Sequence, residues 1–273
     1  MYKKSLLHGL IVQQSIVDLL ASCTYLFFYN QDAPDGTRGR VFCKARALYW
    51  FLAFASIYNL VIITFERYIA VVHPITYRNR NIGGRSRLFY MIPYIIGVLI
   101  SFHLAVIADV NTKLKGECVY SKVAVVPRTI AIFLLAYLIP AGFMIFCYWR
   151  ILCKLRRKSR HIHQDARGKQ PYVTVNKRLM FTMFIVVIAF IITTSPNSIL
   201  YLTYAICQCF DFSTIIAHEI TVLITTCNMC VNPIIYGAKM EDFKNGVREI
   251  WRRMRDTAVD TSHTPTNVMT SIV

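Results

Sequence analysis

Long apolar stretches alternate with short polar segments along the whole chain, and this pattern predicts its fold class. Each apolar stretch has about 20 residues or more, which is enough for a helix to cross a hydrocarbon core of about 30 Å. Most of them lack the polar face that helices of a soluble bundle show at helical spacing. We predict an all-α membrane protein whose spans cover approximately residues 6–28, 48–72, 88–108, 130–152, 179–205 and 215–238.

Composition and charge agree with this prediction and give the spans an orientation. Hydrophobic residues make up 55% of the 273 residues, more than one soluble domain of this size would carry. The net charge of +17 comes mainly from segments 78–87, 150–178 and 239–255, whereas the alternate loops carry mixed charges. Because lysine and arginine mark the cytoplasmic side of a membrane, we expect both termini in the cytosol. This orientation explains the basic charge, so we expect no nucleic-acid partner.

The run CVNPIIYG (Cys230–Gly237) in the last span is the most informative local motif. A proline inside a membrane helix removes a backbone hydrogen bond, so polar neighbours must satisfy the freed carbonyl. Asn228, Asn232 and Tyr236 are such neighbours of Pro233. A kinked helix with a polar seam near the end of a multi-span protein indicates a part that moves.

Ionisable residues inside the spans are few, and each is a candidate functional residue because burying it is costly. They are Asp18 in the first span, Glu66 and Arg67 at the end of the second, His103 in the third, and His218 and Glu219 in the last. No HExxH, GxSxG or Walker-type motif occurs, and no paired carboxylates share a span. We therefore expect no enzymatic activity and no catalytic residue.

Taken in order, these residues resemble the motifs of class A, rhodopsin-like G-protein-coupled receptors, from that family's second helix to its end. The matching residues are Asp18, the triplet Glu66-Arg67-Tyr68, Pro140 with Tyr148, Phe190 with Pro196, and Asn232-Pro233-Tyr236. The resemblance implies a seven-transmembrane receptor bundle in the plasma membrane, represented here by six helices. The subfamily is not fixed by these motifs, and a peptide-receptor-like or orphan member is expected.

The chain also departs from the family pattern. The family's first helix has no counterpart, so we expect an N-terminally truncated receptor, either a truncated gene model or a natural fragment. Thr194 stands where the sixth helix usually has a tryptophan, and Gln13 and Gln14 stand where small or apolar residues are commoner. At the foot of the sixth helix, Asn176 replaces the acidic residue of some members, which predicts measurable basal signalling.

The resemblance assigns roles to buried polar residues. Cys43 and Cys118 would form the family's outer disulfide, whereas pairing of Cys207 with Cys209 stays open. An allosteric sodium ion would be bound by Asp18, Ser56, Asn228 and Asn232. Oxygen ligands around one carboxylate suit a hard cation, and the alternative is a protonated, hydrogen-bonded Asp18 with no ion.

The resemblance also implies an activation route. Ile57, Pro140 and Phe190 would form a packing switch beneath the ligand, with ordinary core packing as the alternative. Arg67, held by Glu66 at rest, would be released to meet Tyr148 and the C-terminal helix of the G protein. The residues implied in coupling and activation are Glu66, Arg67, Tyr68, Tyr148, Asn232, Pro233 and Tyr236.

A ligand pocket is implied among the outer parts of the spans. Its candidate residues are Tyr49, Trp50, Asn197, Tyr201, Tyr204 and His218. Tyr49 stands where aminergic receptors carry an aspartate, so a peptide-like ligand is expected rather than a monoamine. Alternatively, some of these aromatic side chains belong to an interfacial belt that faces lipid.

The C-terminal part carries two further predictions. After a transmembrane receptor domain over residues 1–238, residues 241–255 repeat apolar positions at helical spacing opposite basic ones, which predicts an amphipathic helix on an anionic leaflet. Residues 256–273 are polar and predicted to be disordered in the cytoplasm. Their end, with Ser271 and Val273, resembles a ligand of PDZ domains.

Together these patterns predict a receptor that transmits the binding of an extracellular ligand to a heterotrimeric G protein, with arrestin as a further partner. One alternative is a truncated, non-signalling fragment that acts as a dominant-negative partner. The other is a six-span transporter. A transporter of this kind would be expected to show an internal repeat, and the sequence shows none.

Overall fold

The computed structural model describes the greater part of the chain. The described residues are 6–29, 31–79, 82–110, 116, 118–120, 125–164, 177–207, 216–239, 248, 249, 252 and 255. Within them, six helices are long and apolar enough to cross a membrane: Leu6–Tyr29, Gly36–Val72, Arg87–Ile107, Val125–Arg157, Met180–Cys207 and Ile216–Ala238. The prediction of an all-α bundle with six spans is confirmed.

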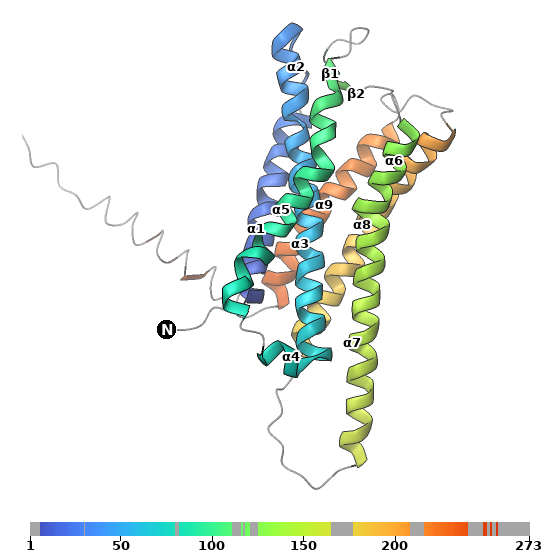
Figure 1. Ribbon diagram of the computed structural model, residues 1–273. Coiled ribbons are helices and arrows are strands. Elements are labelled where there is room, and N and C mark those ends of the chain that lie inside the picture. Colours follow the sequence, from blue (N-terminus) through green and yellow to red (C-terminus); the bar gives the residue numbers. More distant parts are fainter. Residues whose placement is uncertain are drawn as a thin grey trace, which may run out of the picture.

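The spans are built from long helices, with short elements at their ends (Figure 1). The long helices are α1 (Leu6–Tyr29), α3 (Ala47–Val72), α5 (Ile82–Ile107), α7 (Ile139–Gln164), α8 (Lys177–Cys207) and α9 (Ile216–Lys239). The short ones are α2 (Gly36–Ala45), α4 (Pro74–Asn79), α6 (Val125–Phe133) and the π-helix η1 (Leu134–Leu138). Strands β1 (Ala108–Val110) and β2 (Cys118–Tyr120) pair antiparallel, with Asp109 opposite Val119. In Figure 1, α2 and the strand pair lie at one end of the bundle and α4 at the other.

Residues 36–41, which the sequence pattern predicts as part of an outer loop, are helical instead. They begin α2, which is more polar than the long helix α3 that follows it. The backbone continues into α3 because the amide of Arg46 donates to the carbonyl of Phe42, and the amide of Tyr49 donates to that of Arg46. The second span therefore continues outward as one nearly uninterrupted helix.

The core lies around α3, which runs through the middle of the bundle (Figure 1). Buried apolar side chains from α1, α3, α7 and α8 form one cluster that includes Leu10, Leu60, Met144 and Phe190. Large apolar side chains are also exposed on the outside of the bundle, including Leu19, Leu99, Trp149 and Ile192. Such an outer surface is stable only where lipid replaces water, so the structure has the apolar exterior of a membrane protein.

Gly97 allows α5 to approach α3 closely. A Cβ atom at this position would lie 3.0 Å from the carbonyl oxygen of Phe51 and 3.2 Å from the backbone nitrogen of Ala55. Small residues at helix contacts permit such an approach in membranes. We expect Gly97→Val to lower the free energy of unfolding by about 1–3 kcal/mol and to reduce the melting temperature in detergent. Gly142→Val is the matched control, since a Cβ there has nothing within 4 Å, and equal losses in both variants would contradict the prediction.

Candidate functional site

Asp18 lies on α1 at the centre of a buried polar network and is only 1% exposed. Its carboxylate oxygens each accept a hydrogen bond from Gln14 Nε2 at 3.0 Å. Oδ1 also accepts from the hydroxyl of Ser56 on α3 at 2.6 Å, and Oδ2 from Asn232 Nδ2 on α9 at 3.0 Å. A buried carboxyl group needs such donors to offset its lost hydration. The network therefore joins α1, α3 and α9 inside the bundle.

Gln14 is a central member of this network that the sequence motifs do not reveal. Its Nε2 atom also donates to Ser56 Oγ at 2.6 Å, and its Oε1 atom accepts from Asn59 Nδ2 at 2.9 Å. Asn59 Nδ2 donates in addition to the carbonyl of Leu10 at 3.0 Å. Two sequence signals point to it: Gln14 stands where small or apolar residues are commoner, and its spacing of four from Asp18 puts both on one face of a helix.

The structure brings together three of the four side chains that the resemblance implies as sodium ligands. Asp18, Ser56 and Asn232 are joined by hydrogen bonds. Asn228 is buried one turn before Asn232 on α9, but its Oδ1 atom has no hydrogen-bond partner among the described residues. The groups nearest the carboxylate are N–H and O–H donors, whereas a hard cation needs oxygen lone pairs directed toward it. The side chains around Asp18, oriented in this way, therefore do not form a cation site.

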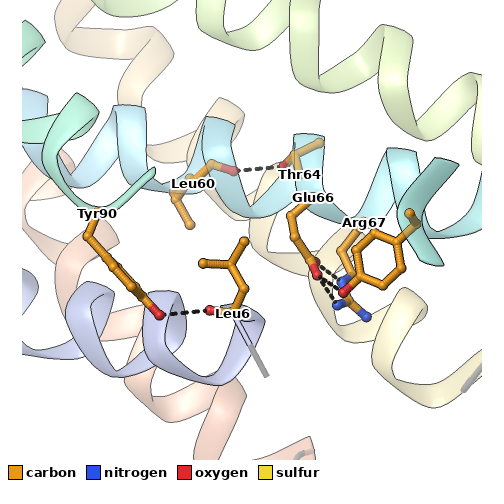
Figure 2. A network of polar contacts seen from close by, with 7 residues as sticks. Leu6, Leu60, Thr64, Glu66, Arg67 and Tyr90 are labelled. Atoms are coloured by element: carbon orange, nitrogen blue, oxygen red, sulfur yellow. Dashed lines mark hydrogen bonds and ion pairs between the residues drawn. The ribbon is translucent and has the colours of Figure 1, made fainter. Parts of the chain in front are cut away.

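A second polar cluster lies where α3 ends beside α4. Glu66 Oε1 accepts a hydrogen bond from Arg67 Nη2 at 2.7 Å, and Glu66 Oε2 pairs with Arg67 Nε. Figure 2 shows the two side chains facing each other beside the last turns of α3. The side chain of Glu66 is 4% exposed and that of Arg67 14% exposed, so this ion pair is largely shielded from solvent. The resemblance implies this pairing at rest, and the charge pattern predicts that this end of the bundle faces the cytoplasm.

Tyr77 on α4 adds a third group to this cluster. Its hydroxyl donates to Glu66 Oε1 at 2.7 Å. Burial and the hydrogen bond to the Glu66 carboxylate raise the pKa of Tyr77 to about 12, so the phenol stays protonated and remains a donor at physiological pH. Sequence reasoning did not single out Tyr77, because its contact with Glu66 depends on how α4 folds back against α3.

The other residues implied in activation are buried between helices or packed at the same end of the bundle. Tyr148 on α7 is buried, and its ring centroid lies 5.9 Å from that of Phe184 on α8. Tyr236 on α9 is fully buried. Tyr68 is half-buried, with its ring centroid 5.8 Å from that of His73. Pro233 lies inside α9, as the motif predicts. A role for these residues in coupling stays a prediction.

The packing-switch residues lie where α3, α7 and α8 meet. Ile57 and Phe190 belong to the same apolar cluster, and Pro140 is buried in the first turn of α7, directly after the π-helix η1. A π-helix inserts an extra residue into a helix and often marks a functional position. The hydroxyl of Tyr58 on α3 donates to the carbonyl of Leu135 within η1 at 2.8 Å, which ties the irregular turn to α3.

The outer end of the bundle is closed by a disulfide between Cys43 on α2 and Cys118 on β2. Their sequence separation is 75 residues. The expected link between the outer loop and a helix top is therefore present. Cys207 is also disulfide-bonded, and Cys209 lies outside the described residues.

Near this end, Tyr49 is fully buried and shares a hydrogen bond of 2.8 Å with the hydroxyl of Thr226 on α9. Its ring packs against those of Tyr25, Tyr29 and Trp50 at centroid distances of 5.5, 5.4 and 5.1 Å. Tyr49 thus lies inside an aromatic cluster, and its match to the aspartate position of aminergic receptors stays a prediction.

The remaining pocket candidates lie on α8 and α9. Asn197 Oδ1 accepts from the hydroxyl of Thr221 at 3.3 Å. Tyr201, Tyr204 and His218 are half-buried, which leaves their assignment to a ligand pocket as a prediction. Sequence reasoning missed Arg46, whose guanidinium lies 3.7 Å from the ring centroid of Tyr29, a cation–π contact.

Several predicted features lie outside the described residues. These are Asn176, most of the amphipathic helix over residues 241–255, and the tail over residues 256–273 with Ser271 and Val273.

Comparison with known proteins agrees with this arrangement. The family model described as 7 transmembrane receptor (rhodopsin family) matches residues 2–236. Somatostatin receptor type 4 of Rattus norvegicus is 25% identical over 226 residues, which cover 78% of this chain and 55% of the receptor. P2Y purinoceptor 8 of Gallus gallus is 24% identical over 262 residues, 89% of this chain and 70% of that protein.

C-C chemokine receptor type 8 of Macaca mulatta is 25% identical over 252 residues, covering 89% of this chain and 69% of that receptor. The chain spans about half the length of the somatostatin receptors that it matches. The family model covers most of the chain, and the six long apolar helices agree with a membrane receptor of this kind. The chain therefore belongs to the rhodopsin family of seven-transmembrane receptors and is a multi-pass protein of the plasma membrane.

Proposed function

We propose that this protein transmits the binding of an extracellular ligand to a heterotrimeric G protein. The observation that carries the proposal is the shielded ion pair of Glu66 with Arg67 at the end of α3. A guanidinium held by a neighbouring carboxylate presents little free charge to a partner. When the pair opens, Arg67 becomes available to the C-terminal helix of a G protein and to Tyr148. The described arrangement corresponds to the resting state in this proposal.

We propose that α3 transmits changes in the buried network to this ion pair, because the helix carries both Ser56 and Glu66. Asn232 directly precedes Pro233 and is bound to Asp18, so a shift of α9 changes a contact with α1. The same helix carries Thr226, which is bound to Tyr49 nearer the outer end. A ligand that moves α9 or α3 would then alter both contacts. We propose that Ile57, Pro140 and Phe190 adjust their packing in the same transition.

The ligand is proposed to be peptide-like rather than a monoamine. The observation that supports this is the neutral, buried Tyr49, which offers no carboxylate to an ammonium group. Known relatives are named as receptors for somatostatin, C-C chemokines, purines and melatonin, so their names support no single ligand class. Aromatic side chains with polar tips, such as Trp50 and Tyr201, are suited to varied peptide side chains.

Further partners are proposed on the cytoplasmic side. Arrestin would compete for the surface that the G protein uses. The amphipathic segment 241–255 would lie on the inner leaflet, and the C-terminal residues Ser271 and Val273 would bind a PDZ domain by strand addition.

Tyr77→Phe is expected to raise ligand-independent signalling, because it removes the hydroxyl that donates to Glu66 and keeps the ring. The increase should be smaller than that caused by loss of the Glu66 charge. The phenol is a donor only while protonated. Burial raises the pKa of Tyr77 to about 12. The stabilisation that its hydroxyl gives to the resting state is therefore complete below pH 10 and is lost as the pH rises through 12. If Tyr77→Phe and wild type show equal basal signalling at equal surface expression, the Tyr77 hydroxyl does not stabilise the resting state.

The proposed function is tested by expressing the protein in cells with a panel of Gα subunits and measuring G-protein dissociation. The first measurement is made without ligand, and the second with a library of peptides and, as a comparison, monoamines. We expect ligand-free dissociation above that of mock-transfected cells and a further response to a peptide. Surface-expressed protein that activates no Gα subunit with any compound would contradict the proposal, and a response to a monoamine alone would contradict the ligand class.

A further inference from the structure

The side-chain amide of Gln14 lies where a cation bound to Asp18 and Ser56 would have to lie. Its Nε2 atom is 3.0 Å from each oxygen of the Asp18 carboxylate and 2.6 Å from Ser56 Oγ. We propose that this amide replaces the cation, so that a covalently tethered donor, and not sodium, stabilises the buried carboxylate. The inference rests on these contacts and does not depend on signalling by the protein.

The directions of the hydrogen bonds support this proposal. The hydroxyl of Ser56 donates to Asp18 Oδ1 and accepts from Gln14, so both its proton and a lone pair are used within the network. Asn232 likewise turns its Nδ2 atom, and not its oxygen, toward Asp18 Oδ2. Each side chain bonded to the carboxylate thus presents a hydrogen atom to it. A cation requires the opposite orientation, with oxygen lone pairs converging on one point.

Asn59 fixes the amide of Gln14 in this orientation. Asn59 Nδ2 donates to Gln14 Oε1 at 2.9 Å and to the carbonyl of Leu10 at 3.0 Å, which places the oxygen of the Gln14 amide away from Asp18. Gln14 and Asn59 are both fully buried, with relative exposures of 0%. Because the amide oxygen has a donor of its own, the nitrogen is the only end of the group free to face the carboxylate.

A sodium ion would have to displace this amide. Entry of the ion would break the contacts of Gln14 Nε2 with Asp18 and Ser56 and would require Gln14 to leave a fully buried position. In return, the ion would gain the buried oxygens of Asn228 and Asn232, which have no hydrogen-bond donor among the described residues. These two oxygens are therefore the groups that a cation would recruit if the amide of Gln14 moved away.

The test is the melting temperature of the purified protein in detergent or nanodiscs, measured in sodium chloride and in choline chloride at equal ionic strength. We expect the wild type to melt at the same temperature in both salts. Gln14→Ala removes the amide and leaves room beside Asp18, so it should melt at a lower temperature but gain about 2–4 °C in sodium chloride. Asp18→Asn in the Gln14→Ala background should abolish that gain, because it removes the charge that attracts the ion.

Gln13→Ala is the matched control. Gln13 is the adjacent glutamine, but its Nε2 atom donates to the carbonyl of Tyr90 at 3.0 Å, outside the network. It should gain no sodium dependence. If Gln14→Ala does not fold, Gln14→Ser also removes the amide, leaves room beside Asp18, and carries the same expectation.

Two results would overturn the proposal. The first is a wild type that is stabilised by sodium over choline and loses this effect with Asp18→Asn, since the ion would then bind despite Gln14. The second is a Gln14 variant that folds and shows no sodium dependence, since Gln14 would then not be what keeps the ion out. Neither result depends on G-protein activation, so failure of this proposal is distinguishable from failure of the proposed function.

Discussion

Replacing Glu66 by glutamine is expected to raise ligand-independent G-protein signalling by about tenfold. The substitution keeps the size of the side chain and removes the charge that holds Arg67 through Nη2 and Nε. Glutamine keeps one oxygen that accepts from Arg67, so the net loss is about one charge-assisted hydrogen bond, whose lower bound of about 1.5 kcal/mol corresponds to a tenfold change in a two-state equilibrium. If opening of this pair is the step that exposes Arg67, the population of the open state rises accordingly.

The measurement is G-protein dissociation in cells without ligand, normalised to surface expression. Glu219→Gln is the matched control, because it removes the same charge from an exposed position at the outer end of α9. If the Glu66→Gln variant shows no more ligand-independent signalling than the Glu219→Gln variant, the ion pair does not stabilise the resting state.

Loss of the disulfide between Cys43 and Cys118 is expected to have the largest effect on stability. The bond closes a loop with a sequence separation of 75 residues. By the chain-entropy estimate for loops of this length, its removal costs about 4 kcal/mol, a large part of the stability of a typical domain. We expect Cys43→Ala to lower the melting temperature strongly and to keep most of the protein from the cell surface.

Cys118→Ala should have the same effect, and the double variant should be no worse than either single one, because all three lack the same bond. Cys227→Ala is the matched control, since Cys227 is a free, exposed cysteine in α9. Normal surface expression of Cys43→Ala would contradict the assigned role of the bond. A double variant far less stable than each single one would show that the cysteines act separately.

Much of the architecture follows from the sequence because its causes are local. The apolar stretches determine where helices cross the membrane, and Pro233 lies inside α9 as the motif predicts. Asp18 is informative because a lone carboxyl group in a span requires polar partners, and two of the implied ones, Ser56 and Asn232, do bond to it.

The partners Gln14, Asn59 and Tyr77 could not be predicted in the same way. Whether Gln14 faces Asp18 or lipid depends on the rotation of α1 against α3, and its amide orientation depends on Asn59 from another helix. Tyr77 reaches Glu66 only because α4 packs beside the end of α3. These contacts are set by tertiary packing, which periodicity does not encode.

Two backbone features also escaped prediction. Helix α2, which extends α3, has a polar sequence that is typical of a loop. Its helical form depends on tertiary contacts, namely the disulfide of Cys43 and the backbone hydrogen bonds around Arg46. The π-helix η1 lies in an uninterrupted apolar run. A turn with one extra residue has the same apolar composition there as a regular α-helical turn, so the sequence does not indicate it. Its contact with Tyr58 on α3 is long-range.

The most direct test of the proposed receptor function is nucleotide exchange on a purified heterotrimeric G protein, measured with the protein reconstituted in nanodiscs. Wild type and Arg67→Ala are compared at equal amounts of folded protein, verified by equal melting behaviour. We predict that wild type accelerates exchange above empty nanodiscs and that Arg67→Ala does not, because the guanidinium released from Glu66 is the group proposed to engage the G protein. Equal acceleration by both proteins, or by neither across the Gα subunits, would contradict this account.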